Sequence, residues 1–171
     1  MSSEIQVRRF AETDEIAPIT TVLHAAYSSL ATAGFRYLAS HQDDATTLNR
    51  LRSGFAFLVE CDGKLLGTAT LYRPSPDSQC EWYRQDTVWR FGQFGVRPGY
   101  QRQGIGARLY DRIEAQARAF GAAKLALDTA EGALHLRRWY EKLGFRFVQF
   151  VSWPDTNYRS VVLSKDLTEL A

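Results

Sequence analysis

The chain has 171 residues, which is an ordinary length for one domain with a buried core. Hydrophobic residues make up 45% and charged residues 23% of it, and these proportions argue against a disordered chain and against a membrane protein. The 21 basic and 19 acidic residues give a formal charge of +2, so bulk charge favours neither nucleic acid nor an anionic membrane as a partner. We therefore expect one domain over residues 1–171.

The cysteines and the start of the sequence bear on metal binding and location. Cys61 and Cys80 have no His or Cys at metal-ligand spacing, so no metal site is predicted, and two isolated thiols are typical of a reducing compartment. The initial sequence MSSEIQVRRF lacks the apolar run of a signal peptide, and no stretch approaches the roughly 20 apolar residues of a membrane helix. We expect a cytoplasmic protein without a membrane partner.

Apolar periodicity and turn residues divide the chain into strands and helices. In chain order, the predicted elements are a strand at 5–9, a helix over about 16–26, a helix at about 43–51, a hairpin of strands at 55–61 and 65–72, a loop at 73–79, a long strand at 82–96, a helix over about 105–117, a strand at 125–127, a helix at 134–143, and two antiparallel strands at 145–151 and 158–164. This order predicts an α/β chain with a mixed sheet.

Individual residues support several of these boundaries. Thr13 or Asp14 is the expected cap of the first helix, because short polar side chains bond to the free N–H groups of a first turn. The Asp-Gly pair at 62–63 has the residue types of a two-residue hairpin turn. Gly92 and Gly95 interrupt the long strand, which indicates a bulge or a close approach of another backbone.

The most informative segment is 91–109, FGQFGVRPGYQRQGIGARL, in which a strand leads through a turn into a glycine-rich helix start. The first turn of a helix presents unpaired N–H groups, and Gly104 and Gly106 allow a phosphate to approach them. The dinucleotide fingerprint does not fit, because Leu109 stands at its third glycine position, and no Lys-Ser/Thr follows as in a Walker A loop. A pyrophosphate would fit this helix start, and the alternative is that Gly104 and Gly106 only loosen the end of a helix.

Residues 101–106, QRQGIG, resemble the acetyl-CoA loop of the GNAT N-acetyltransferases, whose pattern is Gln or Arg, two residues, Gly, one residue, then Gly or Ala. A second segment, 139–145, WYEKLGF, resembles the end of a helix in the same family. The resemblance is close over residues 91–147 and loose over the whole chain. It implies the GNAT fold, a mixed and mostly antiparallel central sheet flanked by about four helices. A splayed pair of parallel strands would end near Val96 and Asp128.

The resemblance also implies roles for individual residues, with acetyl-CoA as co-substrate. The strand backbone near Phe94 and Val96 is expected to hold the pantetheine amides and the acetyl carbonyl. Tyr140 occupies the position of the general-acid tyrosine, and the alternative is a core tyrosine whose hydroxyl bonds to backbone. The residues expected to contact the cofactor are Phe94, Gly95, Val96, Gln101, Arg102, Gln103, Gly104, Ile105, Gly106 and Ala107.

Two positions depart from the family pattern. Ala133 stands where many members have an asparagine that hydrogen-bonds the pantetheine, and Arg90 stands where many have a glutamate that serves as general base. A base is needed because an acceptor ammonium must lose a proton before it attacks a thioester. The base is therefore unassigned, and the candidates are Glu81, Asp86, Asp128 and His135.

These features predict an N-acetyltransferase that transfers acetyl to a primary amine of a small molecule or peptide by direct attack in a ternary complex. The alternatives are an acyltransferase with a longer acyl donor or a different acceptor, and a CoA-binding module without catalysis. No residue selects the acceptor, because fold does not determine substrate. The family resemblance also makes a homodimer an expectation.

Overall fold

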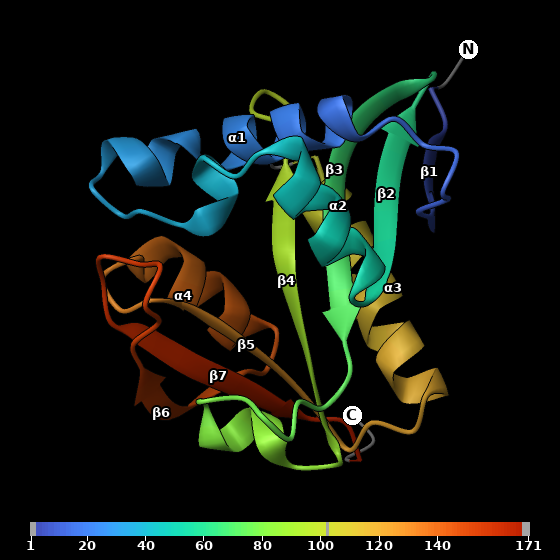
Figure 1. Ribbon diagram of the computed structural model, residues 1–171. Coiled ribbons are helices and arrows are strands. Elements are labelled where there is room, and N and C mark those ends of the chain that lie inside the picture. Colours follow the sequence, from blue (N-terminus) through green and yellow to red (C-terminus); the bar gives the residue numbers. More distant parts are fainter. Residues whose placement is uncertain (1–2, 102, 169–171) are drawn as a thin grey trace.

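The structure is a computed structural model that describes residues 3–101 and 103–168 (Figure 1). Within this part, seven strands form one sheet in the order β1-β2-β3-β4-β5-β7-β6, in which β4 and β5 are parallel and the other neighbours antiparallel. The elements are β1 (Ile5–Arg9), α1 (Ile16–Thr32), η1 (Leu38–Ser40), α2 (Asp44–Arg52), β2 (Phe55–Cys61), β3 (Lys64–Tyr72), η2 (Glu81–Arg84), β4 (Val88–Val96), α3 (Ile105–Ala119), β5 (Lys124–Ala130), α4 (Leu134–Lys142), β6 (Arg146–Val151) and β7 (Ser160–Asp166).

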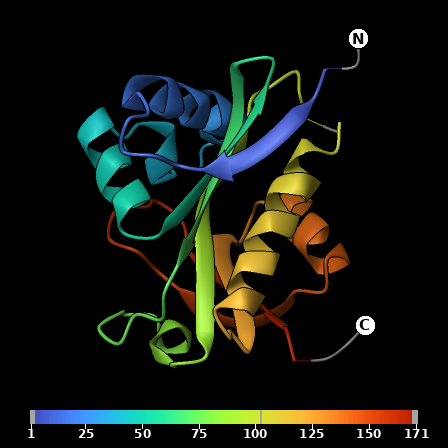
Figure 2. The same ribbon diagram turned by 90° about the vertical axis from the view of Figure 1, so that its right-hand side faces the viewer.

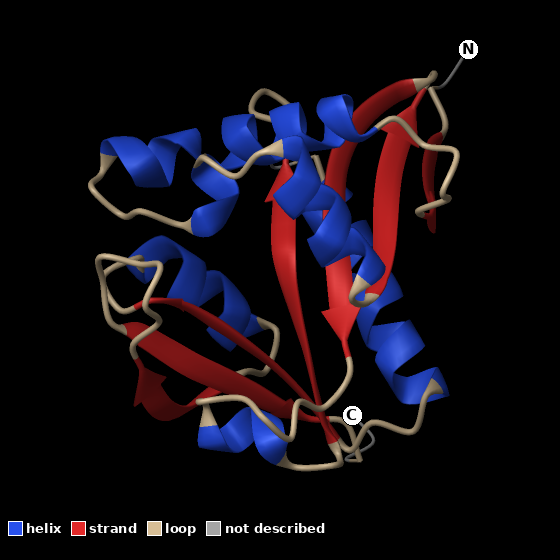
Figure 3. Ribbon diagram, viewed as in Figure 1, coloured by secondary structure: helices blue, strands red, loops and turns tan. Residues whose placement is uncertain are grey.

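The helices cover the two faces of this sheet, α1 and α2 on one face and α3 and α4 on the other (Figures 2 and 3). In β2, Phe57 faces the core under α3, whereas Leu58 faces α1 and α2, because successive side chains of a strand point to opposite faces. The apolar stripe predicted for α3 is buried as expected, with Leu109, Ile113 and Ala117 at 0% exposure. The mixed sheet and four helices confirm the predicted fold class.

The parallel strands β4 and β5 pair over a short distance and then diverge. Their last paired residues are Arg90 and Ala126, although β4 continues to Val96 and β5 to Ala130. Figure 1 shows the two strands separating from the closed end near the carboxyl terminus. The predicted splay is thus confirmed, and it leaves two strand ends with their backbone groups facing one another.

Tertiary contacts override the sequence pattern in the stretch 82–96. Residues 82–84 belong to the 3-10 helix η2, and the strand begins only at Val88. Tyr83 explains the difference, because it is 1% exposed and its hydroxyl donates to Asp128 at 2.7 Å, which a continuous strand would not allow. The predicted interruption is a bulge at Gln93, between the two glycines, where φ is +48°.

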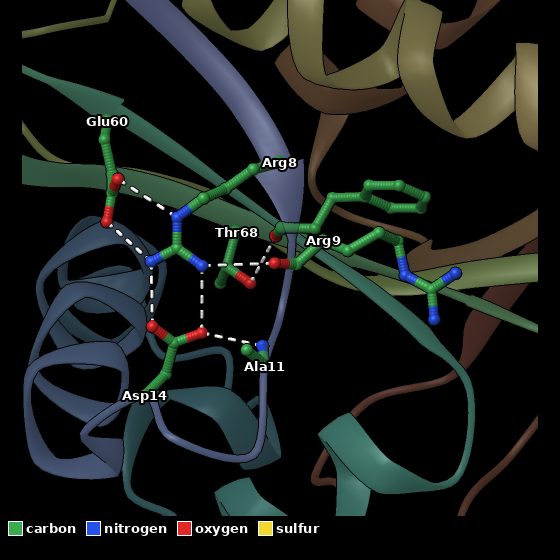
Figure 4. A network of polar contacts seen from close by, with 7 residues as sticks. Arg8, Arg9, Ala11, Asp14, Glu60 and Thr68 are labelled. Atoms are coloured by element: carbon green, nitrogen blue, oxygen red, sulfur yellow. Dashed lines mark hydrogen bonds and ion pairs between the residues drawn. The ribbon is translucent and has the colours of Figure 1, made fainter.

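The cap predicted for α1 is wrong. The N-cap is Glu15 and makes no side-chain cap bond. Asp14 instead accepts two hydrogen bonds from the Arg8 guanidinium, at 2.8 and 2.9 Å, and one from the N–H of Ala11 (Figure 4). Arg8 also donates to Glu60 of β2 and lowers the pKa of Asp14, so this network joins β1, β2 and the start of α1.

Candidate functional site

The end of β4 carries backbone groups that face the gap left by β5. Arg97 N–H donates to Leu66 O of β3 at 2.7 Å. Because the amides of successive strand residues point to alternate sides, the amides of Val96 and Phe94 point away from β3. In the described part of the chain the β4–β5 pairing has ended before both residues, so their amides are directed at the gap.

The backbone of Gly95 faces β3 and not the gap. Its backbone pairs with Thr68 of β3, on the side opposite to the gap. A Cβ at Gly95 would lie 2.8 Å from the Cβ of Ala26, which is closer than side-chain atoms approach one another. Gly95 therefore permits α1 to pack directly on β4.

Two tyrosines hydrogen-bond to the separated strands. Tyr27 of α1 donates its hydroxyl proton to Phe94 O at 3.0 Å. Tyr37 accepts from the N–H of Ala130 in β5 at 2.9 Å, and its hydroxyl lies 2.8 Å from Thr129 Oγ1. The two rings lie 5.3 Å apart, so together they bridge β4 and β5 and help to fix the separation of the strand ends.

No motif or periodicity in the sequence marks these tyrosines as residues of the site. Tyr27 and its partner are 67 residues apart, and Tyr37 and Ala130 are 93 residues apart. A hydrogen bond over such a distance leaves no periodicity or motif in the local sequence. The available signal is weak: Tyr27 follows Leu23 by one helical turn and so lies on the buried side of α1.

The predicted pyrophosphate loop leads directly into α3. Gly104 is the N-cap, with φ of +77°, and provides no side-chain cap, so the first N–H groups of the helix keep their hydrogen-bonding capacity. A Cβ on Gly106 would lie 3.9 Å from the Phe94 ring and from a methyl carbon of Val96. Ile105 is 1% exposed and anchors the helix start in the core. The loop thus adjoins the end of β4.

The other predicted loop residues surround this helix start. Gln101 Nε2 donates to Val96 O at 3.3 Å, and Gln103 Nε2 donates to Gly99 O at 3.2 Å. Ala107 is exposed in the first turn of α3. Arg102 lies outside the described residues. The loop and the gap together present N–H groups, a helix terminus and unpaired strand amides, which fit the anionic and amide parts of acetyl-CoA.

Tyr140 of α4 is 6% exposed, and its ring centroid lies 6.0 Å from that of Phe91. Among the described residues its hydroxyl has no hydrogen-bond partner, unlike the core tyrosine of the alternative interpretation. Burial raises its pKa well above 10.0, so the proton stays on the hydroxyl at neutral pH. Tyr27 and Tyr37 raise the pKa further, although they come from the α1 side.

The four candidate bases occupy different places. Glu81 is exposed in η2, Asp86 is exposed just before β4 at the closed end of the strand pair, and His135 is exposed in the first turn of α4. Asp128 belongs to β5, beyond the last residue that pairs with β4. Of the four, Asp128 is the one on a strand that borders the gap.

The carboxylate of Asp128 is held at both oxygens. Oδ1 accepts from the Tyr83 hydroxyl at 2.7 Å, and Oδ2 accepts from Trp153 Nε1 at 2.8 Å. Burial raises the pKa of Tyr83, and the negative charge of Asp128 raises it further because it disfavours the phenolate. These two donors fix the position of the carboxylate and leave lone pairs for a further proton donor.

The two departures from the family pattern also have clear positions. Ala133 is the N-cap of α4, is 1% exposed and packs in a cluster with Leu30. Arg90 is the last β4 residue that pairs with β5. Its guanidinium lies 4.5 Å from the ring centroid of Tyr72 and 5.3 Å from that of Tyr83. A cation thus stands at the fork of the two strands.

Over residues 3–101 and 103–168, no helix is both long and apolar enough to cross a membrane. In the same part of the chain, no three His, Cys, Asp or Glu side chains are grouped so that they could hold a metal ion.

Comparisons with known proteins agree with this geometry. S-(2-succino)cysteine N-acetyltransferase from Bacillus subtilis (strain 168) is 28% identical over 122 residues, which are 70% of this chain and 72% of that protein. PH1933 from Pyrococcus horikoshii OT3 has the same fold, with a TM-score of 0.75, 19% identity, and coverage of 98% of this chain and 100% of that chain. A GNAT family acetyltransferase from Elizabethkingia anophelis, solved with acetyl-CoA bound, has a TM-score of 0.68, 16% identity, and coverage of 95% and 98%.

The sequence profile of the acetyltransferase (GNAT) family matches residues 22–145, which is well over half of the chain. This match includes β4, β5, Tyr140 and the glycine-rich start of α3. The chain therefore belongs to the GNAT acetyltransferase family.

Proposed function

We propose that the protein transfers an acetyl group from acetyl-CoA to a primary amine of a small molecule by direct attack in a ternary complex. The observation that carries this proposal is the hydroxyl of Tyr140, which keeps its proton and has no hydrogen-bond partner among the described residues, on a side chain that is 6% exposed and packs against Phe91 of β4. A residue kept only for packing has no need of such a group.

The chain would hold acetyl-CoA along the gap. The first N–H groups of α3, after Gly104, would receive the pyrophosphate, and the amides of Phe94 and Val96 would pair with the pantetheine arm. Arg102 and the neighbouring loop residues remain part of this proposal. When bound, acetyl-CoA supplies an acetyl group activated as a thioester. Tyr140 would donate its proton to the departing thiolate.

Asp128 is our proposed proton acceptor for the incoming amine. Asp128→Asn is expected to lower kcat/KM by about 10- to 1000-fold, because an amide cannot take the proton. Trp153→Phe is the matched control, since it removes the bond to Oδ2 and leaves the carboxylate in place. Steady-state rates and melting temperatures should be measured for both. Equal losses in the two variants would mean that Asp128 only stabilises the fold.

Contacts between two loops favour a small acceptor over a peptide. After α1, Arg36 N–H donates to Asn157 Oδ1 at 2.8 Å, and Asn157 Nδ2 donates to Gly34 O at 2.9 Å. Phe35 and Tyr158 pack edge to face at 6.1 Å. These contacts join the segment after α1 to the segment between β6 and β7, so a peptide that entered between the two segments would have to separate them. The B. subtilis relative likewise acts on a small amine, S-(2-succino)cysteine.

The test measures release of free thiol from acetyl-CoA with a panel of amines: S-(2-succino)cysteine, proteinogenic amino acids, spermidine and a short peptide. A thermal shift with CoA alone is recorded in parallel. We expect a shift with CoA and turnover with at least one small amine. A shift without turnover across the panel would favour a CoA-binding module. The panel is then repeated with longer acyl-CoA donors, and turnover with those donors alone would favour the alternative acyltransferase.

A further inference from the structure

A cavity of about 360 Å³ opens beside the fork of β4 and β5, on the face of α1 and α2. This volume is in the range of small-molecule sites. Three arginines from three elements line it: Arg50 from α2, Arg73 just after β3, and Arg90 from β4. The other lining residues are Ser53, Tyr72, Pro74 and Ser75, so no carboxylate lines the cavity.

In the described part of the chain, the three arginines have no acidic partners. None of Arg50, Arg73 and Arg90 takes part in an ion pair among the described residues, whereas Arg8, Arg52, Arg118 and Arg159 do. Arg90 Nε is also buried without a hydrogen-bond partner. Like charges that face one cavity without counter-charges repel one another, and an anion that enters the cavity relieves this repulsion.

The arginines are held in place by neutral groups. Arg50 Nη1 donates to Gln42 Oε1 at 2.7 Å, and Gln42 Nε2 donates to Gln93 at the β4 bulge at 2.9 Å. Arg73 lies 5.0 Å from the ring centroid of Phe55. Because these contacts are to an amide and a ring, they orient the guanidinium groups and leave their charges uncompensated.

The cavity adjoins the place of the proposed reaction. Arg90 lies at the fork, and its guanidinium stands over the ring of Tyr83, which bonds to Asp128. Side chains of β4 alternate between the faces, so Arg90 lies on the face opposite to Trp89 and Phe91, which belong to the core under α3. An acceptor in this cavity would therefore reach the gap from the side opposite to α3.

We propose that the acceptor is an anionic amine, a small amino acid with two or more carboxylates, and that Arg50, Arg73 and Arg90 bind those carboxylates. Guanidinium groups match carboxylates by paired hydrogen bonds, which gives both affinity and orientation. Arg90 thus binds the acceptor at the position where many family members have a glutamate. The proposal rests on the proposed function, since it names the substrate class of the same site.

The experiment compares amines that differ in carboxylates. L-glutamate, L-norvaline and 2-aminopentane share a five-carbon chain and carry two, one and no carboxylates, S-(2-succino)cysteine carries three, and spermidine is a polycation. Each is assayed with acetyl-CoA by thiol release. We expect kcat/KM in the parent to be highest for the two acceptors with two or more carboxylates. A preference for 2-aminopentane or spermidine would overturn the proposal and leave the proposed function standing.

The acceptors differ in intrinsic reactivity as amines, and variants of the protein remove this difference. For each amine, kcat/KM of the variant is compared with kcat/KM of the parent for the same amine. Arg90→Gln and Arg50→Gln are expected to lower kcat/KM by about 10- to 100-fold for L-glutamate and S-(2-succino)cysteine, and by less than about threefold for 2-aminopentane. Arg112→Gln on the exposed side of α3 is the control and should change none of these values.

Two results would contradict the proposal. An equal loss for every amine would show that the arginines act on folding or on acetyl-CoA, and a melting-temperature measurement on each variant identifies the first case. Absence of thiol release with every amine, despite a thermal shift with CoA, would instead refute the proposed function, and with it the substrate class.

Discussion

Tyr140→Phe is expected to lower kcat by about 10- to 10⁴-fold while CoA binding and the melting temperature stay close to those of the parent. The substitution removes one hydroxyl and keeps the ring that packs against Phe91. Since that hydroxyl has no partner among the described residues, its loss breaks no hydrogen bond there. The measurements are kcat with several amines, CoA affinity by calorimetry, and thermal unfolding.

Tyr110→Phe is the matched control for this prediction. Tyr110 is another buried tyrosine of the same core, 2% exposed, but its hydroxyl donates to Glu114 at 3.0 Å and accepts from Lys165 at 3.2 Å. Its removal should cost about 1–3 kcal/mol of stability and leave the rate per folded molecule unchanged. The reverse pattern, with Tyr140→Phe destabilising and fully active when chemistry limits the rate, would remove Tyr140 from the catalytic groups.

Gly106→Glu is expected to weaken CoA binding by about 100-fold or more without destabilising the protein. The added carboxylate would stand in the first turn of α3, where the proposed pyrophosphate site needs open N–H groups. Glutamate is also a better helix former than glycine by about 1 kcal/mol and is favourable near a helix N-terminus. Calorimetry with CoA should therefore show a loss of affinity, while thermal unfolding shows equal or higher stability.

Gly106→Ala is the control for Gly106→Glu, because it changes the backbone preference in the same way but adds neither the charge nor the bulk of the glutamate side chain. A Cβ at this position would meet its nearest neighbours at 3.9 Å, which is ordinary contact, so this variant should bind CoA nearly as the parent does. The family pattern also accepts alanine here. If Gly106→Glu bound CoA as tightly as the parent, the pyrophosphate would have to lie elsewhere, and the loop would have only a structural role.

Local sequence patterns were sufficient to predict most of the helices, strands and turns. The hairpin at the Asp-Gly pair, the apolar stripe of α3 and the glycine-rich start of that helix depend on residues within one or two turns of each other. Steric limits on φ and the periodicity of helices and strands act over that distance, so the sequence reveals them directly. The two linked family motifs then predicted the splay of β4 and β5.

The side chains that border the gap between β4 and β5 are brought there by contacts between segments that are distant in sequence. Tyr27 and Tyr37 bond to strands 67 and 93 residues away, and Asp128 is held by Tyr83, which the sequence pattern had placed in a strand. The predicted cap of α1 was wrong for a related reason, since Asp14 accepts its hydrogen bonds from Arg8 of β1 and from the N–H of Ala11.

The cavity lined by Arg50, Arg73 and Arg90 likewise depends on contacts between distant segments. Arg50, Arg73 and Arg90 are far from one another in sequence, and of the three only Arg90 stands out in the sequence, at the position of the family's glutamate. Only the tertiary fold, in which α2 lies beside the last residue of β3 and the first half of β4, brings them to one cavity, where none has an acidic partner within residues 3–101 and 103–168. The sequence by itself determined most of the helices and strands and the glycine-rich start of α3, because these follow from short-range sterics and hydrogen bonding, and its motifs indicated the family. The tertiary structure decided which charges and hydroxyls meet at the site, because electrostatic and hydrogen-bonding partners are set by distance in space.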